Sequence, residues 1–219
     1  MDHHFESFFN NFGSPIHNES VDAAILTKFK GRLPDRLLEF WQEHGFCGFK
    51  EGLLWVTNPE AYESDMQTWF GQFEGAKDYY VIARTAFGKL YLWGSRTGTL
   101  FTFIDPSRGW LYQNKGNADD IAQGRADQCL EAFFNAQKPE AQDIKDKTGQ
   151  PLFALVVERL GSIKKDEIFY APASHLLPAS ESLRYFTKMD IHAYLSITAK
   201  CVELRISDEL PPEHSTQNA

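Results

Sequence analysis

Cys47 and His44 lie close together in a stretch whose residue types could support nucleophilic chemistry. Cys47 stands between two glycines in the segment GFCGF, and His44 precedes it by three residues. A thiol becomes a good nucleophile when a nearby base favours the thiolate, and flanking glycines could expose the thiol in a tight turn. The same letters also fit a small residue packed in a turn between a helix and a strand. Both interpretations stay open from the residues alone.

Other catalytic and metal-binding motifs are missing from the sequence. The segment GSRTG at 94–98 lacks the lysine of a phosphate-binding loop, and the two adjacent histidines at 3–4 are too few for a ligand set. An odd number of cysteines is present, and their wide spacing matches no zinc site: Cys47, Cys129 and Cys201. We therefore predict no catalytic residue, no metal and no cofactor, and we expect a reducing compartment.

Charged side chains are better candidates for contacts with a partner. Asp119 and Asp120 fall in the first turn of an expected helix, and Asp166 and Glu167 precede an expected strand. His175 lies in a loop beside two leucines. Such residues are often no more than solvated turn charges. They could also complement a basic surface, and we predict these five as partner-binding residues.

The composition limits the classes of partner. The chain has 219 residues, 42% of them hydrophobic, with a net charge of −8. This charge disfavours nucleic acid as a direct ligand, because phosphate binding needs a basic surface. It suits a basic protein partner, and solubility alone explains a net charge of this size as well. No apolar run approaches the roughly 20 residues of a membrane span, and no signal peptide is evident, so we expect a cytoplasmic protein.

The stretch 33–62 has the clearest pattern in the chain. Leu37, Phe40 and Trp41 share one face of a helix that would begin at Pro34 and end at Gly45. A glycine-rich turn, GFCGFKEG, and a strand at 53–56 would follow. A second helix would then begin at Asn58, which can cap it. Two aromatic-rich helices around a strand predict a local hydrophobic nucleus.

Residues 79–113 alternate apolar and polar side chains and are divided by turn sequences. We predict an antiparallel meander of four strands at 79–86, 89–94, 99–104 and 110–113. Its aromatic side chains could stack on nucleic-acid bases, but a place in the core explains them as well.

The other segments predict mainly helices. They are a phenylalanine-rich helix at 1–12, a helix at 20–30 capped by Ser20, a helix from Asn117 through Phe133, a polar linker at 136–150, a helix at 151–160, a strand at 167–171 and a last helix opened by a capping box at 187–190.

These elements predict an α+β fold. We expect the antiparallel meander to be packed by helices on one side, with a smaller, mainly helical C-terminal portion docked on it. The expected division is a domain at 1–115, a second at 116–210 and a flexible tail at 211–219. One compact unit is the alternative.

Several motifs resemble known families. FGSP (12–15), GRLPDRLLEFWQEHGF (31–46) and GLLWVTNP (52–59) resemble the opening of the GAD-like domain family. RLGSIKKDEIFYAPA (159–173) and DIHAYLSITAKCVEL (190–204) resemble the domain that commonly follows it. Together the pair is similar to immunity proteins that protect bacteria from their own type VI-secreted DNase toxins. At 175–183 relatives tend to have glycines that this chain lacks.

The resemblance implies a protein that binds a cognate basic nuclease and occludes its active site or DNA groove, without being an enzyme. It implies no direct nucleic-acid contact and no membrane contact. Two alternatives remain: an interaction or scaffold module of the same fold, and a small-ligand-binding or hydrolytic domain that uses the GFCGF segment.

Overall fold

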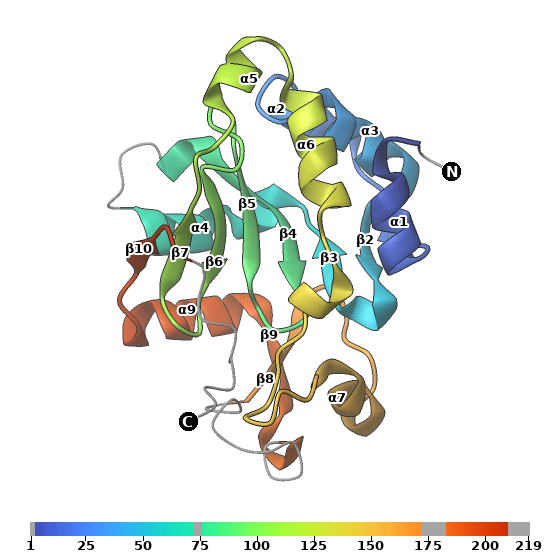
Figure 1. The fold of residues 1–219 in the computed structure, drawn as a ribbon, viewed down its shortest axis with the longest axis vertical. Coiled ribbons are helices and arrows are strands. Elements are labelled where there is room, and N and C mark those ends of the chain that lie inside the picture. The colour runs from blue at the N-terminus through green and yellow to red at the C-terminus, as the bar shows by residue number, and fades with distance from the viewer. Residues whose placement is uncertain (1–2, 72–75, 172–182, 210–219) are drawn as a thin grey trace.

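The computed structural model describes residues 3–71, 76–171 and 183–209, and its centre is an eight-stranded sheet (Figure 1). The strand order is β1-β2-β3-β4-β5-β6-β7-β10. The predicted α+β fold is confirmed. The strands of this sheet are β1 Ile16–Glu19, β2 Phe46–Phe49, β3 Leu54–Val56, β4 Tyr79–Thr85, β5 Leu90–Gly94, β6 Phe101–Asp105, β7 Trp110–Gln113 and β10 Arg205–Ser207. β8 Glu167–Tyr170 and β9 Thr187–Asp190 form a separate antiparallel pair.

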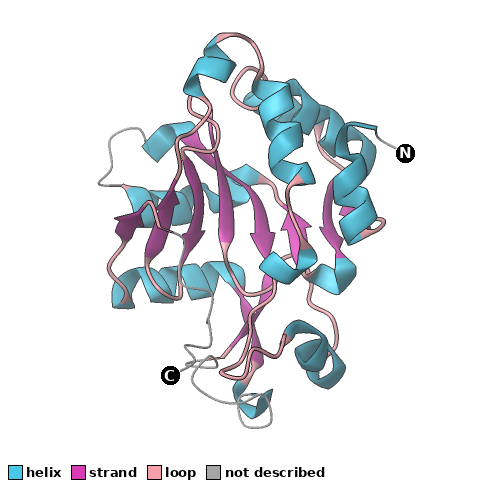
Figure 2. Cartoon of the chain, in the orientation of Figure 1, coloured by secondary structure: helices cyan, strands magenta, loops and turns pink. Residues whose placement is uncertain are grey.

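Helices cover both faces of the large sheet (Figure 2). One face packs against α1 Glu6–Phe12, α2 Ala23–Phe29, α3 Asp35–His44 and α6 Ala126–Asn135, and the other against α4 Glu63–Phe70 and α9 Ile191–Cys201. The helix α7 Phe153–Leu160 packs in a separate core, and the short helix α5 Ala118–Ala122 adds Ile121 to the edge of the first one. Among the described residues, no helix has the length and apolar character needed to cross a bilayer.

The expectation of helices on one side of the meander was therefore wrong. Successive side chains of a strand point to opposite faces. Ile82 and Trp93 join the core beneath α1 and α3, whereas Val81 and Leu92 join the core beneath α4 and α9. Every residue of β5 is buried, which is typical of a strand covered on both faces.

The four-strand meander is confirmed as β4 to β7, but the strands before it were not all predicted. The segment GFCGF was expected to be a turn and instead forms β2, which pairs with β1 and β3. Gly48 lies opposite Trp55, and a Cβ atom there would stand 3.2 Å from the indole ring. The glycine thus allows a close ring contact within a strand rather than a tight turn.

The helix ends lie where the sequence predicted them when the capping residue is next to the helix in the chain. Gly45 ends α3 with a φ of 72°, and the Asn58 side chain accepts a hydrogen bond from the Glu60 amide (3.0 Å). Pro34 occupies the cap position of α3 rather than the first helical position. An Asp127 carboxylate from α6 accepts the Arg36 amide (2.9 Å) and supplies the missing cap from another helix.

Three helix predictions were wrong in detail. Asp22, not Ser20, caps α2 by accepting the Ala24 amide (2.8 Å). The predicted helix through Phe133 is broken at Gly124, which has a φ of 78° and separates α5 from α6. The Asn117 side chain accepts hydrogen bonds from the Thr99 amide and hydroxyl instead of capping α5.

The C-terminal segments join the same body as the N-terminal ones. Residues 187–190 form β9 instead of a capping box, although Asp190 does cap α9 by accepting the Ala193 amide (2.8 Å). β10 pairs in parallel with β7, so the sheet continues across the expected boundary at residue 115. The expected linker 136–150 is packed as well, because the Tyr91 hydroxyl donates to the buried Gln142 amide oxygen (2.6 Å). These contacts connect segments on both sides of the expected boundary at residue 115.

Candidate functional site

A cluster of polar side chains lies where the C-terminal segments meet the sheet. Tyr62 precedes α4, Asp65 lies in its first turn, and Arg84 comes from β4. Asp166 belongs to the turn before β8, and His192 is the second residue of α9. Asp166 interacts electrostatically with Tyr62, Arg84 and His192, which places all of them in one charged network.

Arg84 is the buried centre of this network. Its side chain is fully buried, and its guanidinium lies 5.2 Å from the centre of the Trp55 ring. It donates to the carbonyl oxygens of Thr85 (3.1 Å), Lys164 (3.2 Å) and Lys165. Burial lowers the pKa of Arg84, but an arginine with such partners stays protonated. Arg84 thus fixes the loop before β8 against the sheet.

The Asp65–His192 pair lies at the rim of the same network. His192 Nδ1 is 2.6 Å from Asp65 Oδ2, and the His192 ring centre lies 5.1 Å from that of Tyr62. The hydrogen bond with Asp65 raises the pKa of His192, whereas partial burial opposes this shift. Burial raises the pKa of Tyr62 to about 12, so its hydroxyl stays neutral. The proton of this pair is therefore held more tightly by His192 in the folded protein than in the unfolded chain.

We expect this pair to make stability depend on pH. The folded-state pKa of His192 is raised, so its contribution is complete below the unfolded value, about 6.5, and is lost as pH rises through the folded value. The side chain of His192 is 35% exposed, so His192→Gln should lower the free energy of unfolding by no more than about 1 kcal/mol near pH ~5.5.

Urea unfolding between pH ~5.5 and ~8.5 measures this effect, because the loss should shrink towards the upper pH. The exposed His3 offers a matched control, and His3→Gln should cause no pH-dependent loss. A His192→Gln loss that stayed constant with pH would contradict the assignment.

The predicted partner-binding residues do not form one surface. Asp119 and Asp120 belong to α5, whereas Asp166 and Glu167 lie at the start of β8, at the opposite end of the molecule (Figure 1). Asp120 pairs with Arg125. His175 lies outside the described residues.

Asp166 and Glu167 belong to the polar cluster. Asp166 is exposed, and the half-buried Glu167 accepts the Lys164 amide (2.9 Å). Glu167 also stands opposite Asp190 in the β8–β9 pair. Like charges opposite one another in a sheet are unfavourable, so this edge concentrates negative charge at a cost to stability.

Sequence reasoning missed the other members of the cluster. Tyr62 falls in the aromatic-rich helix expected from Asn58 on, and Tyr62, Asp65, Arg84 and His192 were not predicted as site residues. Arg84 did carry a usable signal, since it interrupts the apolar run YYVIARTAF. A charge in a buried strand needs partners from elsewhere in the chain.

The nucleophile hypothesis for Cys47 was wrong. Cys47 lies within β2 and is fully buried. Burial raises the pKa of the Cys47 thiol to about 12, which keeps it protonated at neutral pH. His44 packs its ring against Phe9 and Phe40 instead of activating the thiol. Among the described residues, no group of three or more His, Cys, Asp or Glu side chains could hold a metal ion.

Comparison with known proteins agrees with this fold. No curated protein matches the chain. The crystal structure of Atu4351 from Agrobacterium tumefaciens superposes with a TM-score of 0.77 at 20% sequence identity, over 96% of this chain and 95% of that one. At this identity the likeness shows the fold alone. The GAD-like domain model matches residues 3–104, as the sequence motifs predicted. This part of the chain, somewhat less than half of it, is therefore similar to the GAD-like domain.

Proposed function

We propose that this protein is an immunity protein that binds a cognate type VI-secreted nuclease and neutralises it by occlusion. The observation that carries this proposal is the match of residues 3–104 to the GAD-like domain. That region contains the motifs by which the chain resembles the DNase immunity proteins, and the segments 159–173 and 190–204 extend the resemblance. The proposal places the protein in the cytoplasm, where its toxin would act.

The charge of the chain supports a basic partner. The net charge is −8, and Asp166, Glu167 and Asp190 gather at the base of the β8–β9 pair. Complementary charge mainly accelerates association and selects the partner, while buried apolar contacts supply most of the affinity. We therefore assign this acidic edge to the steering of a basic nuclease.

One experiment distinguishes the immunity function from the alternative of a scaffold module. The tagged protein would be purified from lysate of its own strain, and each neighbouring gene would be expressed with and without it in a second bacterial host. We expect one basic protein in stoichiometric amount whose expression alone degrades cellular DNA, and which becomes harmless on co-expression. Stable complexes with proteins that are harmless alone, and no protection from any neighbouring nuclease, would favour the scaffold module.

The two ends of the molecule can be separated by charge variants. Asp166→Asn with Glu167→Gln should lower the association rate constant for the nuclease by about tenfold at low ionic strength. Asp119→Asn with Asp120→Asn removes the same charge at the opposite end and serves as the matched control. Stopped-flow binding at several salt concentrations measures both. Equal effects of the two pairs would contradict a steering role for the β8 end.

A further inference from the structure

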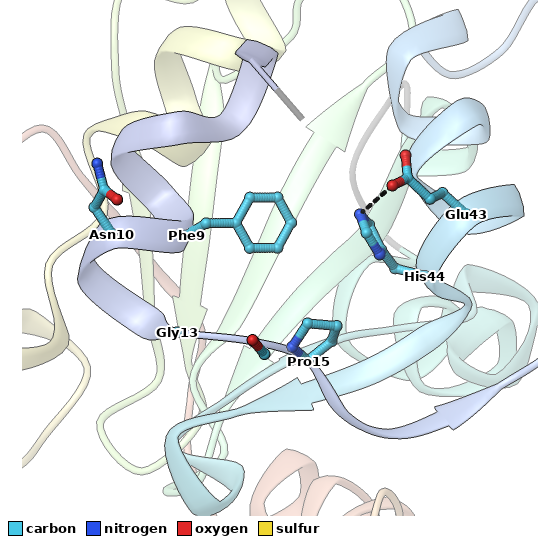
Figure 3. A pocket seen from close by; sticks show the side chains of 7 residues that line it. Phe9, Asn10, Gly13, Pro15, Glu43 and His44 are labelled. Carbon is cyan, nitrogen blue, oxygen red and sulfur yellow. Dashed lines mark ion pairs between the residues drawn. The ribbon is translucent and has the colours of Figure 1, made fainter. Parts of the chain in front are cut away.

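A small pocket opens between the ends of α1 and α3 (Figure 3). Phe9 from α1 and His44 from α3 both line it with their rings in contact, 5.2 Å between the ring centres, and Pro15 closes the space beside Gly13. Its volume is about 240 Å³. Small-molecule sites usually measure about 300–1,000 Å³, so this pocket suits one side chain better than a whole ligand.

The pocket has an unsatisfied nitrogen. Nε2 of His44 is buried and has no hydrogen-bond partner in the described part of the chain. Its nearest carboxylate oxygen, from Glu43, lies 3.6 Å away, which is too long for a hydrogen bond. A buried polar atom without a partner is costly. Nε2 has almost no accessible surface, so a donor that enters the pocket can reach it and remove that cost only when the exposed Glu43 side chain turns aside.

The electrostatics of the pocket favour a cation. The Glu43 side chain is 62% exposed at the rim. α3 ends at His44 and α1 ends at Phe12, so the negative ends of both helix dipoles lie at the pocket. The His44 carbonyl oxygen is already occupied by the Asn18 amide (2.7 Å). None of the residues that line the described pocket is a lysine or an arginine.

We propose that this pocket binds an arginine side chain of the protein partner. The aliphatic stem would lie along Phe9 and Pro15, and the planar cation would stack near the Phe9 ring. A guanidinium carries five N–H donors in a fixed fork, enough to reach both the Glu43 carboxylate and His44 Nε2. This inference gives the immunity complex an anchor and rests on the proposed function for the identity of the partner.

The pocket can be tested without the partner. An N-acetylated, C-amidated Gly-Arg-Gly tripeptide would be titrated into the full-length protein, with the ring signals of Phe9 and His44 followed by NMR. We expect saturable changes in the chemical shifts of both rings, with a Kd of about 1 mM. The same tripeptide with citrulline in place of arginine keeps the shape but lacks the charge, and should give no saturable shift.

Variants of the pocket provide the second part of the test. Glu43→Gln and His44→Phe preserve size and ring packing, and each should weaken tripeptide binding about two- to fivefold. The exposed Glu140→Gln is the matched control and should bind like the unaltered protein. No saturable shift up to about 20 mM, equal binding of the citrulline peptide, or a double variant that binds normally would overturn the inference.

The outcome for the pocket can be told apart from the outcome for the proposed function. If the tripeptide binds but no neighbouring nuclease is neutralised, the arginine site stands and the immunity function fails. If the protein neutralises a nuclease but the tripeptide does not bind, the immunity function stands and the anchor fails.

Discussion

Replacing Arg84 by alanine is expected to lower the free energy of unfolding by about 3–5 kcal/mol. Arg84 is fully buried, and its guanidinium donates to the carbonyls of Thr85, Lys164 and Lys165. Alanine removes these charge-assisted bonds and also leaves a cavity beside Trp55. The loop before β8 would lose its attachment to the sheet, so Arg84 connects the region that matches the GAD-like domain model to the C-terminal segments.

Urea unfolding followed by tryptophan fluorescence measures this loss. Arg84→Met separates its two causes, because it keeps the aliphatic stem over Trp55 and removes only the donors, and it should cost about 1–3 kcal/mol. Arg96 is 81% exposed and pairs with Asp78, so Arg96→Ala should change stability by no more than about 0.5 kcal/mol. An Arg84→Ala loss as small as that of Arg96→Ala would show that the buried contacts carry little stability.

Replacing Phe8 by alanine is expected to lower the free energy of unfolding by about 3–5 kcal/mol, because it leaves a cavity in the aromatic core. Phe8 has no exposed surface, and its ring centre lies 4.8 Å from Phe12, 4.9 Å from Phe49 and 5.4 Å from Phe134. It therefore joins α1 to β2 and to α6. A cavity at this position cannot collapse easily, because three different elements fix the surrounding rings.

Two further variants keep this prediction testable if Phe8→Ala does not fold. Phe8→Leu preserves much of the volume and should cost about 1–1.5 kcal/mol. Ile197 is 52% exposed, so Ile197→Ala should cost about 0.5 kcal/mol or less. Thermal unfolding of all three variants gives the order of their stabilities. A Phe8→Leu protein no less stable than Ile197→Ala would argue against a central role for α1.

Only part of the candidate site could be predicted from the sequence. Asp166 and Glu167 stood out because charges flank an apolar run that reads as a strand. Asp65, His192 and Arg84 did not stand out, since each becomes a site residue only through contacts with residues that are distant in the chain. Asp65 and His192 are separated by 127 residues in the chain, and nothing local marks them as a pair.

The N-terminal aromatic helix, the meander of β4 to β7 and the glycine stop of α3 follow from the sequence itself. Each depends on periodicity within about ten residues or on a turn residue at one position. Tertiary contacts determine that GFCGF is a strand, that β10 extends the sheet and that helices cover both faces. Short segments have too little local preference to fix their own conformation, so their partners elsewhere in the chain select it.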